Sequence, residues 1–226
     1  MNVLVVSAHP DDEVLGCGAT MARTIKEGHR VSVVILGEGS TARTARRADA
    51  NQRQVLQLEK NAVQANRILG IKTVTCHRLP DNRFDTVPLL DIIKIVEQAV
   101  QSSRAEVVYT HHAGDLNIDH MITHRAVLTA TRPEPGHRVK TVYAFEIPSS
   151  TEWAFGQLHP AFNPTVFVDV AATLAAKRRA LEVYQRELRP FPHPRSHKTV
   201  TSNAQRWGSV VGVAAAEAFE LIRMVR

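Results

Sequence analysis

Short apolar runs alternate with longer amphipathic stretches along most of the chain. A short apolar run is typical of a buried strand, and apolar positions that recur every three or four residues are typical of a helix. The pattern predicts strands at residues 2–7, 31–36, 73–76, 106–110, 141–145 and 165–169. It predicts helices at residues 13–27, 48–69, 89–101, 119–131, 171–187 and 213–225. This alternation indicates an α/β fold, with a mostly parallel, Rossmann-like sheet and helices on both of its faces.

The alternation becomes irregular after residue 145, where prolines begin to interrupt it. We expect one domain over residues 1–226, made of a Rossmann-like core at 1–145 and a smaller C-terminal lobe at 146–226 that completes the site. Within the lobe, residues 189–197 hold three prolines and two histidines and predict an ordered loop.

The composition is that of an ordinary globular protein, with 44% hydrophobic and 22% charged residues. The formal charge of +6 permits an anionic substrate, but the basic residues are scattered, so we expect no nucleic-acid partner. Cys17 and Cys76 make neither a metal-type pair nor a disulfide framework, which indicates a reducing compartment. No apolar stretch approaches bilayer length and no secretory signal pattern is seen, so we expect no membrane span and a cytoplasmic location.

Candidate chemistry begins directly after the first predicted strand, where Ala8 to Glu13 read AHPDDE. In parallel α/β sheets, ligands bind beyond the carboxyl ends of the strands. Acidic residues at such a point also cap a helix and complement its dipole, but capping needs only one of three consecutive carboxylates. Because Pro10 suits the entry to a helix, His9 stays at the strand end, where it can share one ion with Asp12.

The same turn does not support dinucleotide binding. A strand-to-helix turn that binds a pyrophosphate carries GxGxxG, whereas Gly16 and Gly18 lie a turn too late. Three carboxylates would also repel a pyrophosphate unless a cation intervened.

A second dense polar cluster, HHAGDLNIDH at residues 111–120, follows the strand predicted at 106–110. In a parallel sheet the two clusters lie at one edge. His9, Asp12 and His120 would then provide three protein ligands and leave room for water, which is the arrangement of catalytic zinc. Non-haem Fe(II) uses the same ligand set.

Together, AHPDDE and the pattern HxxDxNxDH resemble the PIG-L/LmbE-like family of zinc-dependent N-acetylglucosamine-type deacetylases. The similarity extends through residues 146–153 to residues 212–221. It implies one Zn²⁺ per chain, or Fe²⁺ or another divalent ion, held by His9, Asp12 and His120, with Asp11 as the catalytic base. The implied reaction removes an acetyl group from an N-acetylated sugar or sugar conjugate and releases acetate. The resemblance also implies a homo-oligomer, because family members often self-associate.

Three further residues are candidates for the catalytic machinery. Asp119 is expected to orient a ligand histidine, to cap the following helix, or both. Some family members have a histidine where this chain has Asn117, whose amide donates a hydrogen bond but no proton. The general acid is therefore left open between Asp11 and His193, and the alternative for His193 is an exposed loop histidine without a role.

Substrate contacts are predicted from residue chemistry and place in the chain. Glu38 and Ser40 follow the second strand and can hydrogen-bond sugar hydroxyls. Arg53 and Arg195 can pair with a phosphate or carboxylate, although an arginine is more commonly solvated. Glu146 and Trp153 are predicted to line the pocket, where the indole would support a pyranose ring; the alternative for Trp153 is a place in the core.

Three other functions compete with this hypothesis. A metal-dependent amidase or esterase acting on a non-sugar acyl substrate would use the same metal chemistry. A phosphate-receiving domain binds Mg²⁺ through an acidic pair after the first strand, but it needs an acceptor aspartate after a central strand, and the strand at 73–76 ends without one. A non-catalytic sugar- or phosphate-binding module is disfavoured because all proposed ligands and the base are present.

Overall fold

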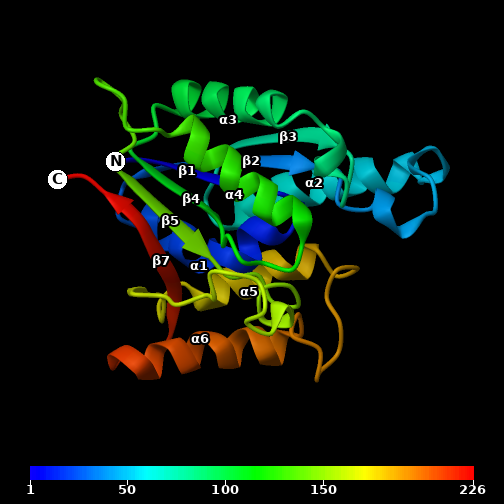
Figure 1. Ribbon diagram of the computed structural model, residues 1–226. Helices are drawn as coiled ribbons and strands as arrows, with labels where there is room; N and C mark the ends of the chain where they lie inside the picture. The colour runs from blue at the N-terminus through cyan, green and yellow to red at the C-terminus, as the bar shows by residue number, and fades with distance from the viewer.

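The computed structural model describes residues 1–226 and contains one seven-stranded sheet in the order β3-β2-β1-β4-β5-β7-β6 (Figure 1). Neighbouring strands from β3 to β5 are parallel, whereas β7 runs antiparallel to both β5 and β6. The expected mostly parallel sheet is therefore confirmed. The strands are β1 (Asn2–Ser7), β2 (Arg30–Gly37), β3 (Thr73–Leu79), β4 (Val107–His111), β5 (Thr141–Phe145), β6 (Val166–Asp169) and β7 (Ala216–Met224).

Helices cover both faces of the sheet, as the alternation of elements predicts (Figure 1). One face packs against α1, α2 and α5, and the other packs against α3 and α4. The helices are α1 (Asp12–Lys26), α2 (Gln52–Ile68), α3 (Leu89–Ser103), α4 (Ile118–Ala130), α5 (Leu174–Val183) and α6 (His197–Val211).

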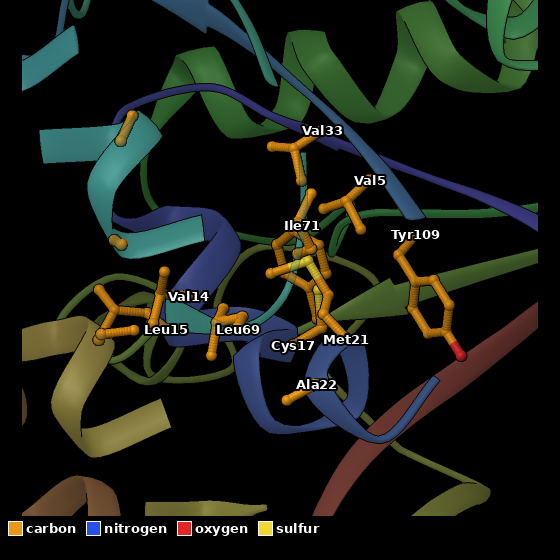
Figure 2. Close-up of a cluster of buried hydrophobic side chains, with 14 of the residues drawn as sticks. Val5, Val14, Leu15, Cys17, Met21, Ala22, Val33, Leu69, Ile71 and Tyr109 are labelled. Atoms are coloured by element: carbon orange, nitrogen blue, oxygen red, sulfur yellow. The ribbon is translucent and has the colours of Figure 1, made fainter. Parts of the chain in front are cut away.

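Side chains of the central strands alternate between two buried clusters. Val3 and Val5 of β1 belong to the cluster under α1 and α2, while Leu4 and Val6 belong to the cluster under α3 and α4. Figure 2 shows part of the first cluster, where Val5 lies among side chains of α1 and the neighbouring strands. Burial on both faces explains why these strands are continuous apolar runs in the sequence.

The helix predicted at 213–225 is wrong, because this segment forms β7. Alanine, glutamate, leucine and arginine favour a helix here, but β7 pairs with β5 on one side and β6 on the other. These long-range backbone hydrogen bonds override a weak local preference. The sequence also gave no prediction for α6, whose N-cap Ser196 accepts a hydrogen bond from the backbone N–H of Thr199.

The segment 146–226 continues the sheet of the first 145 residues through β6 and β7. The predicted ordered loop at 189–197 lies between α5 and α6. No helix combines the length and the apolar character needed to cross a bilayer.

A buried ion pair ties this last part of the chain to α1. The helix α1 is interrupted at Cys17, whose φ is −144°. Glu217 of β7 accepts hydrogen bonds from the backbone N–H groups of Ala19 (3.1 Å) and Thr20 (2.7 Å) beyond the interruption. The Lys177 ammonium of α5 donates to Glu217 (2.6 Å) and to the carbonyl of Leu15 (2.7 Å). The pair therefore satisfies the backbone groups that the interruption frees.

Replacing Glu217 with alanine leaves the Lys177 charge buried without its counter-charge. We expect the free energy of unfolding, measured by urea denaturation, to fall by about 3–5 kcal/mol. The double variant Lys177→Met, Glu217→Leu removes both charges and should lose less. A loss below about 1 kcal/mol for Glu217→Ala would show that the pair contributes no more than a surface salt bridge.

Candidate active site

The carboxyl ends of β1 and β4, which are adjacent parallel strands, bring the two sequence motifs together. His9 lies in the turn after β1, Asp12 is the first residue of α1, and His120 lies in the first turn of α4. One ligating atom from each of these three buried residues lies within 4.8 Å of the others. Asp12 Oδ2 is 3.4 Å from His9 Nδ1 and 3.3 Å from His120 Nε2. The structure thus brings the three predicted ligands to one point.

Both histidines turn their second ring nitrogen toward a buried carboxylate. His9 Nε2 lies 2.9 Å from Asp119 Oδ2, and His120 Nδ1 lies 3.1 Å from Asp115 Oδ1. A carboxylate on the outer nitrogen fixes the ring and the tautomer, and it is typical of metal-ligating histidines.

The two outer carboxylates are themselves held in place. Asp119 accepts hydrogen bonds from the backbone N–H groups of Asn82 (2.6 Å) and Phe84 (2.9 Å). Asp115 accepts from the hydroxyls of Ser150 and Thr151. The proposed capping role of Asp119 is wrong, since the N-cap of α4 is Asn117, whose side chain accepts from the N–H of Asp119 (2.9 Å).

The cluster has the electrostatics of a cation site. Burial lowers the pKa of His120, but Asp12 and Asp115 outweigh burial and raise it to about 9. The pKa of His9 is also raised. Burial lowers this pKa, but the carboxylates of Asp119 and Asp12 outweigh burial. One oxygen of Asp12, Oδ1, is buried without a hydrogen-bond partner. Two imidazole nitrogens and one carboxylate, which has an unpartnered oxygen, therefore fit a divalent ion, and the ion would replace the protons that the carboxylates hold on the histidines.

Asp11 lies beside the cluster in an uncommon backbone conformation, with φ at 105°. Its buried carboxylate accepts one hydrogen bond, from Arg195 Nη1 at 2.8 Å. Burial raises the pKa of Asp11 to about 8, although the Arg195 guanidinium opposes this rise. A bound cation favours the ionised form of a neighbouring carboxylate, which is the form that accepts a proton.

Glu13, the third carboxylate of the motif, fastens the turn. It accepts hydrogen bonds from the backbone N–H of Asp11 (3.1 Å), the amide of Asn66 (2.9 Å) and the hydroxyl of Tyr184 (2.8 Å). Its oxygens are thus occupied by structural contacts, in line with the structural role expected for one of the three carboxylates.

Several predicted residues lie around this cluster. The Asn117 amide donates a hydrogen bond to Asn82 Oδ1 (3.0 Å). Asn82 follows Asp81 in the chain, and Asp81 contacts His9. The rings of His193 and Trp153 meet edge to face with centroids 5.6 Å apart, and Trp153 is 39% exposed.

Glu38 and Ser40 are buried on either side of Gly39. This glycine packs against Pro10 of the AHPDDE motif. A Cβ on Gly39 would lie 2.6 Å from Pro10 Cδ, and φ at this glycine is 71°. The Glu38 carboxylate pairs with Arg47, and Ser40 lines a small pocket beside Tyr184 and Glu187. The loop after β2 therefore touches the turn that carries His9 and Pro10.

Two predicted substrate residues are not brought to the cluster. Arg53 is exposed in the first turn of α2 and lines a groove that contains none of the candidate metal ligands. Glu146 accepts hydrogen bonds from Asn203 (2.9 Å) and Trp207 (2.6 Å) of α6. In the structure, Glu146 ties α6 to the end of β5.

Sequence reasoning missed two residues of the site. His111 accepts a hydrogen bond from the backbone N–H of Ala8 (2.8 Å) and stacks on His120 with ring centroids 4.0 Å apart. Asp81 Oδ1 lies 3.3 Å from His9 Nε2. Because β3 runs on to Leu79, an aspartate does follow this strand closely, contrary to the expectation from residues 73–76. The strand is an edge strand, however, so it does not supply the central acceptor of a phosphate-receiving domain.

The family model described as PIG-L, GlcNAc-PI de-N-acetylase, matches residues 4–131, which is more than half of the chain. The chain belongs to the PIG-L family. Both polar motifs, and with them His9, Asp12 and His120, fall within the matched residues.

Curated relatives of this PIG-L family member are named as deacetylases. The uncharacterized deacetylase YaiS of Escherichia coli is 28% identical over 173 residues, which cover 74% of this chain and 81% of the relative. A probable N-acetyl-alpha-D-glucosaminyl L-malate deacetylase 2 of Bacillus cereus is 26% identical over 184 residues, which cover 79% and 83% of the two chains.

Solved structures share the fold of this PIG-L family member. The N,N'-diacetylchitobiose deacetylase of Pyrococcus horikoshii superimposes with a TM-score of 0.77 at 17% identity, covering 98% of this chain and 83% of that one. GalB, the 4-carboxy-2-hydroxymuconate hydratase of Pseudomonas putida KT2440, gives 0.74 at 21% identity, covering 100% and 99%. At these identities the likeness shows the fold alone, and the fold carries more than one reaction.

Proposed function

We propose that this PIG-L family member is a metal-dependent hydrolase that removes the acetyl group from an N-acetylated amino sugar or its conjugate and releases acetate. The convergence of His9, Asp12 and His120 at the end of β1, with Asp11 beside them, is the observation that carries this proposal. The family description and the relative from Bacillus cereus support an N-acetylglucosamine-type substrate.

His9, Asp12 and His120 would hold one divalent ion. The unpartnered Asp12 Oδ1 and the mixed nitrogen and oxygen donors favour zinc, and Fe²⁺ accepts the same set. When bound, zinc polarises the amide carbonyl and lowers the pKa of water to about 7.

Asp11 is the base in this proposal. It takes one proton from the water whose oxygen attacks the acetyl carbon. Asp11 then gives this proton to the amide nitrogen as the carbon–nitrogen bond breaks, so that a free amine and acetic acid are the products, and the acid releases its proton to the solvent to give acetate. The Asn117 amide donates hydrogen bonds only and cannot supply this proton.

His193 is assigned an assisting role. Partial burial and the guanidinium of Arg195 lower the pKa of His193, which disfavours the protonated form that a general acid needs. Its Nδ1 already accepts a hydrogen bond from the backbone N–H of Arg195 (3.1 Å). We therefore assign the proton transfers to Asp11 and contact with the substrate to His193.

Trp153 is the proposed surface for the sugar ring. Its partly exposed indole lies against His193, on the segment after β5 that also supplies Ser150 and Thr151 to Asp115. A flat apolar face beside polar side chains suits a pyranose ring. Glu38 and Ser40 are proposed to contact the part of the substrate near Pro10. With two free cysteines and no disulfide, we also propose a cytoplasmic location.

Acetate release from a substrate panel tests the proposed reaction. We expect the zinc-loaded protein to release acetate from N-acetylglucosamine or from its glycosides and nucleotide conjugates, and more slowly from aryl acetamides. Release from aryl acetamides alone would favour an amidase for non-sugar acyl substrates. Release from no member of the panel would contradict the proposal.

A further inference from the structure

Arg195 connects three loops that the chain brings to the site from distant positions. Its Nη1 donates to Asp11 Oδ2 at 2.8 Å, and its Nε donates to Ser149 Oγ at 2.8 Å and to the carbonyl of Pro148 at 3.3 Å. Only 20% of the side chain is exposed. The guanidinium therefore bridges the turn after β1 and the segment after β5 from the loop that joins α5 to α6.

Both residues that Arg195 joins have an uncommon backbone conformation. Asp11 has φ at 105° and Ser149 has φ at 68°, and neither is a glycine. Such conformations cost free energy and persist only where surrounding contacts fix them, which occurs most often at functional sites. Arg195 supplies a side-chain contact to each of the two residues.

Arg195 is itself held on its loop. Its backbone N–H donates to His193 Nδ1, and Ser196 next to it caps α6. The Arg195 contact is the single hydrogen bond that the Asp11 carboxylate accepts. No other hydrogen bond fixes where this buried carboxylate points.

We propose that Arg195 is a positioning residue that holds the Asp11 carboxylate in its working orientation, and not primarily a ligand for an anionic group of the substrate. This inference rests on the proposed role of Asp11 as base. Its geometric reason is that Nη1 and Nε already donate to Asp11 Oδ2 and Ser149 Oγ, in a side chain that is largely buried. A planar guanidinium reaches both partners at once, which the single ammonium of a lysine does not.

The kinetic test compares Arg195→Ala and Arg195→Lys with Arg189→Ala, a change at an arginine of the same segment. For the substrate that wild type cleaves best, we expect Arg195→Ala to lower kcat about 100-fold with KM within about twofold and with unchanged zinc per chain. Arg195→Lys should fall between wild type and alanine, and Arg189→Ala should match wild type. Added guanidinium ion at millimolar concentration should restore part of the kcat of Arg195→Ala.

Two outcomes of this comparison overturn the inference. A raised KM with unchanged kcat would assign Arg195 to substrate binding. Loss of zinc in Arg195→Ala would assign it to the support of the metal ligands.

Thermal unfolding gives a readout that does not depend on activity. Arg195→Ala is expected to lower the Tm by about 3 °C in the wild-type background and by clearly less in the Asp11→Ala background, where the guanidinium has already lost its carboxylate partner. Equal shifts in both backgrounds would overturn the contact. If wild type released no acetate from any substrate, the proposed function would fail. The comparison of Tm shifts in the two backgrounds would still decide whether Arg195 holds Asp11.

Discussion

Replacing Asp11 with asparagine is expected to lower kcat for acetate release about 1,000-fold while zinc per chain stays unchanged. Asparagine has nearly the shape of aspartate, and its Oδ1 still accepts the hydrogen bond from Arg195, so the turn after β1 should keep its structure. It does not accept the proton of the attacking water, which is the step assigned to Asp11. Initial rates of acetate release and elemental analysis of the same samples measure the two quantities.

The matched control for this variant is Asp85→Asn, a change at an exposed aspartate in the segment after β3. We expect its rate and its zinc content to equal those of wild type. An Asp11→Asn enzyme that retained a tenth or more of the wild-type kcat would remove Asp11 from the role of base.

Replacing His120 with alanine is expected to weaken zinc binding more than about 100-fold, because even the loss of a residue that only supports a ligand costs 10- to 100-fold. Acetate release should fall with the bound zinc. The change also leaves Asp115 Oδ1 and Asp12 Oδ2 without the ring that lies between them. Competition with a fluorescent zinc chelator measures the affinity, and His77→Ala, a histidine change on β3, is the control.

Unchanged zinc affinity in His120→Ala would mean that the ligand set is wrong. In that case the second group of buried metal-type side chains, His9, Asp81 and Asp119, would be the next set to change. The carboxylates of Asp81 and Asp119 already accept hydrogen bonds from the backbone N–H groups of residues 42, 82 and 84. We therefore expect these two carboxylates to orient His9.

The parallel strands and the meeting of two motifs at one sheet edge are predictable from the sequence, because both depend on short-range patterns. Continuous apolar runs identify β1 and β4, and the order of elements sets their direction. Once both strands are parallel neighbours, the residues after them must lie together. This reasoning brings His9, Asp12 and His120 to one edge, and the resemblance to the family assigns them as the ligands.

Other features depend on contacts between segments far apart in the chain. The helix-favouring residues of β7 form a strand because β5 offers an unpaired edge, and this edge is invisible in local sequence. The end of β3 was placed too early, which hid Asp81 from the candidate site. Glu146 was expected in the pocket, but the partners that hold it, Asn203 and Trp207, lie on a helix that the sequence did not predict.

Arg195 illustrates the same limit. Its charge and its loop suggested contact with an anionic substrate, whereas the structure pairs it with Asp11, 184 positions earlier in the chain. The identity of a residue indicates what it is able to bind, but its partner is decided by the packing of loops that only the fold brings together.

Removal and return of the metal test the central claim most directly. Wild-type protein is stripped with a chelator, checked for zinc by elemental analysis, and assayed for acetate release from the best substrate of the panel before and after zinc is added. We predict background release from the stripped protein and full recovery at about one zinc per chain. Stripped, zinc-free protein that releases acetate at the untreated rate would contradict a metal-dependent deacetylase.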